Sequence, residues 1–390
     1  MMQKLSWPNW KRSSKACRND FPRALIRDYK KLMPGNSIGY IFRLTTFGES
    51  HGKATGGVID GLPAGLAVDY NFIQQELKRR MPVYPGSTAR KEPDEVEFLS
   101  GISNGISLGT PVGFVIKNVA GQPADYNELS GLYRPSHADY SYEKKYGTTG
   151  ISGGGRASGR ETVARVVAGA FAKLLLKSSG IEIHAYISQI GNLIQEIDWK
   201  QADMSAAKQS AYGYLDKKTE KKVTDIINDA ESKGDTLGGI ITALIKGTPP
   251  GLGEPVFDKL QANLAKAMLS IGSAKAFEYG LGFESSLWKG SDYNDQMTVK
   301  EGKVTFKTNH DGGIQGGISN GEDIIFRVGF KPIPSVKVSQ STVNRKGNPA
   351  EIKISGRHDT CHVPRLVVVV EAMAALVMAD HLLLARSSRL

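Results

Sequence analysis

Three glycine-rich clusters that carry histidine, arginine or aspartate are the parts of this sequence that could do chemistry. They are Gly48–Gly52 with His51, the paired segments Arg134–Asp139 and Gly153–Thr162, and Gly356–Cys361. Histidine suits proton transfer near neutral pH, and arginine suits charge pairing with phosphate or carboxylate groups. The residue types therefore predict an enzyme that acts on a small polyanionic molecule with histidine acid–base chemistry.

The first cluster contains Gly48-x-Ser50-x-Gly52, which is the pattern of a hydrolase nucleophile elbow. The same spelling occurs three more times in a chain with 44 glycines, so it carries little information. An elbow needs a strand before the serine and a helix after it. Residues 40–44 indicate the strand, but residues 56–63 indicate a second strand closed by a turn. We therefore expect Ser50 not to be a nucleophile.

Gly153–Thr162 opens a strongly apolar helical stretch. Backbone amides at a helix N-terminus, flanked here by Arg156 and Arg160, form an anion site, and the alternative is a glycine-rich turn that only caps the helix. The segment is not a Walker loop, because it lacks the pattern Gly-x4-Gly-Lys-Ser/Thr, and it is not a dinucleotide fingerprint, because Ser158 occupies the last glycine position. The helix dipole disfavours arginine in the first turn, and this favours a bound anion.

The other polar residues leave alternatives open. His51 and His137 lie in loops of small residues and are either catalytic or surface and capping side chains, while Asp359 is either a base or a salt-bridge partner. Arg79 and Arg80 end a predicted helix, where cations are favoured without any ligand. No set of histidine, cysteine and acidic residues has metal-ligand spacing, so we expect no metal.

Charge and composition narrow the class of protein. The 390 residues carry a net charge of +11, but residues 1–32 alone hold nine basic and two acidic side chains, which leaves 41 basic and 37 acidic elsewhere. The charge therefore gives no reason to expect a nucleic-acid partner. The longest apolar run, 366–384, contains Glu371, Asp380 and His381, so we expect no membrane span. Two cysteines cannot build a disulfide framework, which favours a reducing, cytoplasmic setting.

Residues 1–32 lack sustained helical periodicity, and Met33 looks like a fresh beginning. The segment is a basic arm, a targeting peptide or an upstream extension of the reading frame, and we favour an extension without function. Residues 33–390 are expected to form a single domain, because nothing resembling a linker interrupts them.

The sequence also contains two similar halves, about 216 residues apart at their markers. Gly101–Gly105 and Gly317–Gly321 are identical, and each is followed by Val-Gly-Phe. Each half ends in a helical stretch, Arg160–Leu176 or Pro364–Leu384, that is apolar around nearly its whole circumference. Such helices must be buried on several sides. We therefore predict an α+β fold with long buried helices layered between two mostly antiparallel sheets, in two pseudo-repeated halves.

At the three clusters the sequence resembles the chorismate synthase family, over essentially all of residues 33–390. The motifs that carry the resemblance follow one another in the family's order, which makes the match specific. They are Phe42-Arg43-x-Thr45-Thr46-Phe47-Gly48-Glu49-Ser50-His51-Gly52, Arg134-Pro135-Ser136-His137-Ala138-Asp139-Tyr140, Lys145-Tyr146-Gly147, Gly153-Gly154-Gly155-Arg156-x-Ser158-x-Arg160-Glu161-Thr162 and Gly356-Arg357-His358-Asp359.

The resemblance implies an activity, a cofactor and an assembly. Members of the family convert 5-enolpyruvylshikimate 3-phosphate to chorismate and phosphate by a 1,4-anti elimination in the shikimate pathway of aromatic amino acid biosynthesis. They require reduced FMN without net redox change, and they are cytoplasmic homotetramers. The resemblance also implies a link to NADP, while the sequence leaves open whether this chain reduces its own flavin.

The resemblance also implies site residues. His51 would protonate the departing phosphate, His137 would set the protonation of the flavin, and Asp359 would help to take a proton from the flavin side. The residues that would bind substrate are Arg79, Arg80, Arg134 and Arg160. The residues that would hold FMN are Arg156, Ala157, Ser158, Gly272, Ser273, Gly316, Lys331, Pro332, Ile333, Pro334, Ser335 and Arg357.

The chain departs from the family pattern at several positions. They are Pro85, Val119–Gln122, Thr148–Ser152, Gly272-Ser273 and Thr360. The family pattern has a second substrate-binding arginine where this chain has Pro85, unless the loop aligns with a shift that places Arg90 in that role. Because both histidines and Asp359 remain, the departures bear on substrate affinity and loop order more than on reaction type. A relative that binds FMN without turnover stays open as the alternative.

Removing residues 1–32 is expected to leave assembly and turnover unchanged, because the matched halves begin after Met33. Size-exclusion chromatography and a turnover assay of the chain that starts at Met33 check this, with the full chain as the reference. A truncated protein that is folded but inactive would show that the segment is functional.

Overall fold

The computed structural model describes residues 35–81, 84, 86–87, 93–119, 131–147, 152–195, 197–200, 202–354 and 358–388. Residues 36–390 form one compact unit. The expectations for residues 1–32, Pro85, Arg90 and Arg357 lie outside the described residues.

The first half of the unit builds a five-stranded antiparallel sheet, called here the first sheet. In Arg43–Gly48 and Val112–Lys117 buried residues alternate with less buried ones, so one face of the sheet is covered. In spatial order its strands are β1 (Ser37–Ile38), β2 (Arg43–Gly48), β3 (Ala54–Asp60), β7 (Val112–Lys117) and β4 (Val96–Phe98). The helices of this half are α1 (Tyr70–Arg79), α2 (Asp139–Tyr146) and α3 (Thr162–Lys177), and α3 is preceded by the short 3₁₀ helices η3 (Ser152–Ala157) and η4 (Gly159–Glu161).

The second half builds another five-stranded antiparallel sheet, called here the second sheet. In spatial order its strands are β11 (Ala274–Tyr279), β16 (Ile324–Phe330), β10 (Gly239–Lys246), β8 (Glu182–Ile190) and β9 (Leu193–Ile194). The helices of this half are α4 (Ser205–Gln209), α5 (Lys217–Ser232), α6 (Leu260–Leu269), η5 (Gly282–Leu287), α7 (Gly290–Tyr293) and α8 (Val363–Ala385). Small two-stranded sheets pair β5 (Ile102–Ser103) with β6 (Ile106–Ser107), β12 (Met297–Lys300) with β13 (Lys303–Phe306), β14 (Ile314–Gln315) with β15 (Ile318–Ser319), and β17 (Gln340–Val343) with β18 (Pro349–Ile352).

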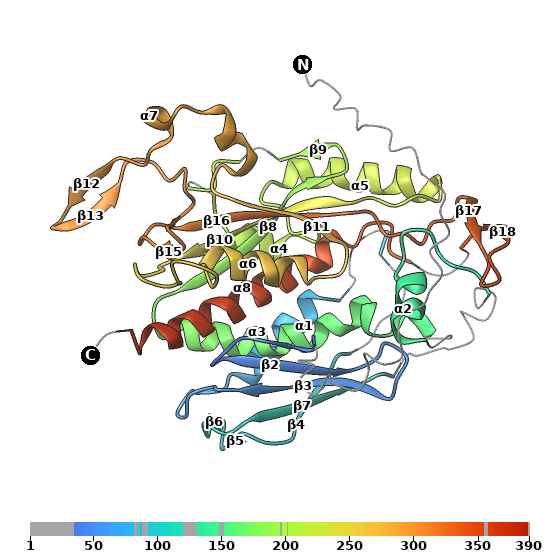
Figure 1. The fold of residues 1–390 in the computed structure, drawn as a ribbon, viewed down its shortest axis with the longest axis horizontal. Helices are drawn as coiled ribbons and strands as arrows, with labels where there is room; N and C mark the ends of the chain where they lie inside the picture. The colour runs from blue at the N-terminus through green and yellow to red at the C-terminus, as the bar shows by residue number, and fades with distance from the viewer. Residues whose placement is uncertain are drawn as a thin grey trace, which may run out of the picture. The chain divides into compact units, whose positions relative to one another are not determined.

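Helices lie between the two sheets, as Figure 1 shows. Helix α3 packs on β2 and β3 of the first sheet, α8 packs on β8 and β10 of the second, and the two helices pack against each other. Both are buried over most of their surface, because both are apolar on nearly all sides. The predicted α+β sandwich, with buried helices between two antiparallel sheets, is confirmed.

The two halves repeat the same hydrogen bonds. In each half a serine of a small hairpin donates its hydroxyl hydrogen to a proline carbonyl and accepts the N–H of a leucine. The bonds are Ser107 Oγ to Pro63 O (2.7 Å) and from Leu66 N (2.9 Å), and Ser319 Oγ to Pro249 O (2.6 Å) and from Leu252 N (2.9 Å). Ser107 and Ser319 are therefore equivalent, and they lie 212 residues apart along the chain.

This equivalence corrects the alignment of the halves drawn from sequence. The identical segments Gly101–Gly105 and Gly317–Gly321 hold different strands of the hairpin, β5 in the first half and β15 in the second. The offset of 216 residues does hold between β7 and β16, since Phe114 of β7 pairs with Gly57 of β3 and Phe330 of β16 pairs with Gly239 of β10. It does not hold for the partner strands, because Gly57 and Gly239 are 182 residues apart. The hairpins and the strands have different offsets because more paired residues precede Phe330 in β16 than precede Phe114 in β7. Strand β16 is already paired to β10 at Ile324, whereas β7 is paired to β3 only from Val112.

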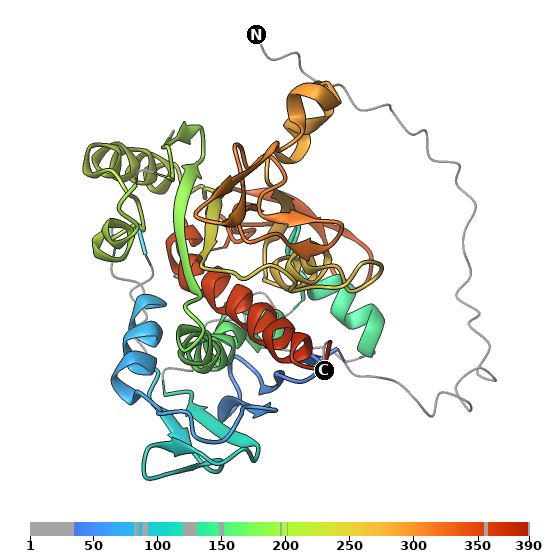
Figure 2. The same ribbon diagram turned by 90° about the vertical axis from the view of Figure 1, so that its left-hand side faces the viewer.

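Helices α3 and α8 cross where both present small residues. Figure 2 shows α3 nearly end-on, with α8 running obliquely past it. A Cβ atom added at Gly169 would lie 2.3 Å from the Cβ of Ala372, a distance that real Cβ atoms do not adopt. Glycine at this position therefore sets how closely the two halves approach.

A buried group of charged side chains joins four elements at the same interface. Glu371 of α8, which is fully buried, accepts two hydrogen bonds from Arg79 of α1 (2.6 and 2.9 Å) and one from Lys173 of α3 (2.6 Å). Its carboxylate also accepts the backbone N–H of Ala185 in β8 at 3.1 Å. Glu76 of α1 completes the group by contacting both Arg79 and Lys173. Burial opposes ionisation, but Arg79 and Lys173 outweigh it and hold the pKa of Glu371 below its ordinary value.

Helix α8 is long and apolar enough to cross a membrane by length and composition, and within the described ranges it is the one helix that passes this test. However, 94% of its most apolar window is buried inside the protein. Its apolar surface is thus used for packing between the sheets.

Replacing Gly169 with alanine is expected to lower the free energy of unfolding by about 1–3 kcal/mol, because the added methyl group overpacks the crossing of α3 and α8. Helix propensity alone would predict a gain of about 1 kcal/mol. Gly290→Ala is the control, since Gly290 begins α7 with nothing within 4 Å of its added Cβ. Denaturant titration measures both variants, and an equal or raised midpoint for Gly169→Ala would contradict the packing argument.

Candidate active site

A cavity of about 690 Å³ lies where the N-termini of α3 and α8 meet. The two ends are equivalent in the two halves, and each presents backbone N–H groups and the positive end of a helix dipole. The cavity is lined by Arg80, Met81, Asp94, Arg134, Ser136, His137, Ala138, Arg156, Ala157, Ser158, Gly159, Arg160, Glu161, Thr162, Arg165, Leu269, Ser270, Ile271, Gly272, Ser273, Ala274, Lys331, Ile333, Pro334, Ser335, His358, Asp359, His362, Arg365 and Leu366.

Most of the arginines that line the cavity are paired with carboxylates. Arg134 holds Asp139 with two side-chain hydrogen bonds of 2.7 Å, and Arg165 donates to Glu161 at 2.7 Å. The remaining pairs are Arg365 with Asp359 (2.7 Å), and Arg80 and Arg160 with the shared carboxylate of Asp94. Each arginine is thereby held in place before any ligand arrives.

Arg156 and Lys331 have uncharged partners within the described residues. Arg156 donates to Gly48, Thr46 and Asn36, and Lys331 donates to the backbone carbonyl of Ser136 at 2.6 Å. Burial first, and then the charge of nearby Lys275, lower the pKa of Lys331. These two cations have positive charge left to offer an anionic ligand.

His137 is oriented by its neighbour Asp139. The Asp139 carboxylate lies 2.7 Å from Nδ1 of His137 and also accepts from Arg134. Burial raises the pKa of Asp139, but the hydrogen bonds from Arg134 and His137 outweigh it and hold this pKa below its ordinary value. An ionised carboxylate can only accept, so Nδ1 carries a hydrogen and Nε2 is the atom that can exchange a proton with a ligand.

His51 lies in the turn between β2 and β3 and does not line the cavity. Its Nδ1 is 2.6 Å from Oγ of Ser50, which is buried. Asn118 ties this turn to the cavity wall, because its amide donates to Glu49 and Gly52 while its carbonyl accepts from Arg160 at 2.9 Å. A strand, and not a helix, follows Ser50, so the expected absence of a nucleophile elbow is confirmed.

The third cluster contributes two side chains to the cavity, His358 and Asp359. Asp359 is bonded to Arg365, and His358 lies beside it. Burial first, and then the positive charge of Arg134, lower the pKa of His358. The sequence interpretation passed over Arg365, although it stands in the first turn of a predicted helix, where the argument used for Arg160 applies equally.

His362, to which the sequence interpretation assigned no role, occupies the N-cap position of α8 without a side-chain capping hydrogen bond. Its Nε2 is 2.5 Å from Oγ of Ser273, whose φ of 69° is a left-handed conformation that side chains rarely adopt. The carbonyl of Ser273 accepts the N–H of Lys331 at 3.0 Å. Burial lowers the pKa of His362 to about 4. Ser273 and His362 are 89 residues apart, so no local pattern in the sequence could have predicted their contact.

The structure brings most of the expected site residues together and leaves others outside. The expected residues that line the cavity are His137, Asp359, Arg80, Arg134, Arg160, Arg156, Ala157, Ser158, Gly272, Ser273, Lys331, Ile333, Pro334 and Ser335. Those that do not are His51, Arg79, Gly316 and Pro332. Arg79 is the clearest departure, because its guanidinium is bound to Glu76 and Glu371 in the buried charged group.

A cavity of this size, lined by paired arginines and an imidazole backed by a carboxylate, defines an enzyme that acts on a small polyanion. Comparison with known proteins names the family. The family model described as chorismate synthase matches residues 42–383. The chain belongs to the chorismate synthase family, whose members are carbon–oxygen lyases acting on phosphates, and the resemblance seen in its motifs is confirmed.

Individual relatives agree with this assignment. The chain is 52% identical to a chorismate synthase of Bacteroides fragilis over 356 residues, which cover 91% of this chain and 99% of the relative. It is 49% identical to a chorismate synthase of Nitratidesulfovibrio vulgaris over 358 residues, with 91% and 99% coverage. A solved structure titled "Crystal Structure of Chorismate Synthase" is similar with a TM-score of 0.72 and 31% identity, and covers 89% of this chain and 93% of its own.

The neutral, half-buried His362 is expected to make stability depend on pH. Its pKa is lowered from 6.5 to about 4, so the unfolded chain binds the proton more tightly than the folded one. The contribution to stability is therefore complete above pH 6.5 and is lost as the pH falls towards 4, by up to about 1.4 kcal/mol per pH unit.

Denaturant titrations of wild type and His362→Asn between pH 7.5 and pH 4 (about one titration per half unit) measure this effect. The difference in unfolding free energy should be constant above pH 7 and should shrink below about pH 6.5, because asparagine does not titrate. Parallel curves over the whole range would show that His362 does not titrate as described.

Proposed function

We propose that the protein converts 5-enolpyruvylshikimate 3-phosphate to chorismate and inorganic phosphate, with reduced FMN as cofactor and without net redox change. The observation that carries this proposal is the cationic cavity at the joined N-termini of α3 and α8, in a chain of this family. The substrate carries a phosphate and two carboxylates, and FMN adds a further phosphate. Clustered arginines supply the charge pairing that such ligands need.

The residues present fit an anionic cofactor. Arg156 and Lys331 have uncharged partners among the described residues. Ala157, which ends η3, and Gly159, which begins η4, are exposed. We propose that Arg156–Ser158, Gly272-Ser273 and Lys331–Ser335 hold FMN, with Gly316 and Arg357 as further members. When bound, the reduced flavin supplies electron density to the substrate that loses phosphate.

The elimination needs a proton donor for the leaving phosphate and a proton acceptor. We propose His51 as the donor, because its imidazole suits proton transfer near neutral pH and its Nδ1 shares a hydrogen bond of 2.6 Å with Oγ of Ser50, which positions the ring in the turn. Asp359, held by Arg365, is proposed to help to take the proton from the flavin side. His137, with Nδ1 bonded to Asp139, would hold or release a proton at Nε2 beside the cofactor.

Substrate binding is assigned to the arginines of the cavity. Arg134, Arg80 and Arg160 are fixed by carboxylates and are proposed to bind the phosphate and carboxylates of the substrate. Arg79 is proposed to assist substrate binding indirectly, by fixing the position of the adjacent Arg80, since the guanidinium of Arg79 is itself bound to Glu371.

We also propose a cytoplasmic homotetramer without nucleic-acid or membrane partners. Support for assembly comes from the segment 282–306, which exposes large apolar side chains of the kind that mark protein–protein contacts. They are Phe283 (82% exposed), Leu287 (83%), Met297 (66%), Val299 (70%) and Val304 (64%). Support for a reducing compartment comes from the two cysteines, of which Cys361 is buried and free.

Anaerobic incubation with the substrate and chemically reduced FMN tests the activity, with chorismate and free phosphate as the products measured. His51→Ala and His137→Ala are each expected to reduce turnover by about 10²–10⁴-fold, because each removes a positioned proton carrier. Folding and assembly should stay near normal, since neither side chain belongs to the apolar core.

Ser50→Ala is the matched variant and is expected to retain much of the rate, because Ser50 is not a nucleophile. An inactive Ser50→Ala together with an active His51→Ala would overturn the assignment of this turn. Binding of FMN without any product from the wild-type chain would instead favour a non-catalytic relative.

A further inference from the structure

Arg156 is held in the cavity differently from the arginines around it. Arg134, Arg165 and Arg365 each donate to a carboxylate, and this neutralises most of their charge. The bonds of Arg156 within the described residues go to uncharged oxygens. They are Gly48 O (3.3 Å), Asn36 Oδ1 (3.1 Å), Thr46 O (3.3 Å) and Thr46 Oγ1 (2.7 Å).

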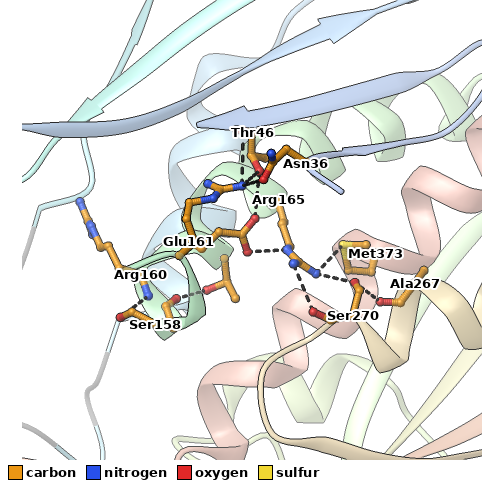
Figure 3. A network of polar contacts seen from close by, with 12 residues as sticks. Asn36, Thr46, Ser158, Arg160, Glu161, Arg165, Ala267, Ser270 and Met373 are labelled. Atoms are coloured by element: carbon orange, nitrogen blue, oxygen red, sulfur yellow. Dashed lines mark hydrogen bonds and ion pairs between the residues drawn. The ribbon is translucent and has the colours of Figure 1, made fainter. Parts of the chain in front are cut away.

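The shortest of these bonds leads to a carboxylate through a hydroxyl group. Figure 3 shows that hydroxyl group, of Thr46, beside the Glu161 carboxylate. Thr46 Oγ1 donates its single hydrogen to Oε1 of Glu161 at 3.1 Å and accepts from Nη2 of Arg156. A carboxylate can only accept and a guanidinium can only donate, so the direction of both bonds is determined. The order of donation is Arg156 to Thr46 to Glu161.

The charge of Glu161 is balanced by a different arginine. Its Oε2 accepts from Nε of Arg165 at 2.7 Å, and Arg165 also donates to Oγ of Ser270 at 2.7 Å. Glu161 therefore ties strand β2 of the first half to the turn after α6 in the second half (Figure 3). The hydroxyl of Thr46 thus lies between Arg156 and the Glu161 carboxylate and bonds to both.

We propose that Thr46 is a positioning residue whose hydroxyl holds Arg156 for the anionic cofactor without neutralising its charge. Thr46 is buried in β2, where its backbone is fixed by pairing with Gly57. A carboxylate in place of the hydroxyl would hold the guanidinium as firmly, but it would compete with the incoming phosphate. This inference rests on the proposed function, in which Arg156 binds FMN.

The test is a fluorescence titration of the full chain with oxidised FMN in the presence of saturating substrate. Thr46→Val removes the hydroxyl and keeps the branched shape, so it is expected to weaken FMN binding about tenfold or more. Thr46→Ser keeps the hydroxyl and is expected to bind within about threefold of wild type. Thr46→Ala, which also lacks the hydroxyl, repeats the test should the valine variant fail to fold.

The chain offers a matched control one strand away. Thr55 of β3 is buried like Thr46, and its hydroxyl has no hydrogen-bond partner among the described residues. Thr55→Val is expected to leave FMN affinity unchanged, because it removes a buried hydroxyl from the same sheet without touching Arg156. Thermal melting of all variants checks that the fold is kept.

A double-mutant cycle with Arg156→Ala separates positioning from general packing. If Thr46 acts through Arg156, Thr46→Val should cause no further loss of FMN affinity once Arg156 is alanine. A further loss, equal binding by Thr46→Val and wild type, or equal weakening by Thr46→Ser and Thr46→Val would each overturn the inference. Absence of FMN binding by the wild-type chain would refute the proposed cofactor itself, and the inference with it.

Discussion

The fully buried carboxylate of Glu371 is the constraint on which the arrangement of the two halves depends. A charge removed from water must be met by opposite charge and hydrogen-bond donors, and breaking a buried pair is strongly destabilising. Glu371 of α8 therefore requires Arg79 from α1, Lys173 from α3 and the N–H of Ala185 from β8 to lie around it. Apolar packing alone would let the helices slide, whereas this group fixes their positions along one another.

The contacts around Glu371 also determine the geometry of the cavity. Arg80 follows Arg79 at the end of α1, so the helix turn that buries one guanidinium against Glu371 presents the next to the cavity. Helix α3, which carries Lys173 in its body, begins at the segment with Arg156 and Arg160. Helix α8 begins directly after Asp359 and His362. Holding three helices at one buried point thus brings their ends to one site.

The distribution of charge in the cavity follows from the same free-energy cost of burying a charge. Arginines that sit deep, such as Arg80 and Arg160, share the carboxylate of Asp94, because unpaired charges are costly away from water. Arg156 and Lys331 are less enclosed and are held by uncharged oxygens among the described residues. The site therefore combines arginines that are held and largely neutralised by carboxylates with two cations, Arg156 and Lys331, that can pair with an anionic ligand.

Several features were determined by the sequence itself, because they depend on neighbours along the chain. Helices that are apolar on all sides had to be buried between layers, and this led to the correct fold class. The contact of His137 with Asp139 spans two residues, so it follows from the local turn. A strand after Ser50 was also readable, and it removed the hydrolase interpretation.

Only the tertiary structure decided which distant side chains meet. Arg79 and Glu371 are 292 residues apart, Arg156 and Thr46 are 110 apart, and His362 and Ser273 are 89 apart. Helical and strand periodicity tells which face of an element is buried, but it does not tell which element covers that face or at what register. For this reason the substrate-binding role that the resemblance implies for Arg79 could not be weighed against its contact with Glu371, which only the tertiary structure places beside it. For the same reason the identical segments Gly101–Gly105 and Gly317–Gly321 suggested an alignment that the hydrogen bonds of the two hairpins corrected.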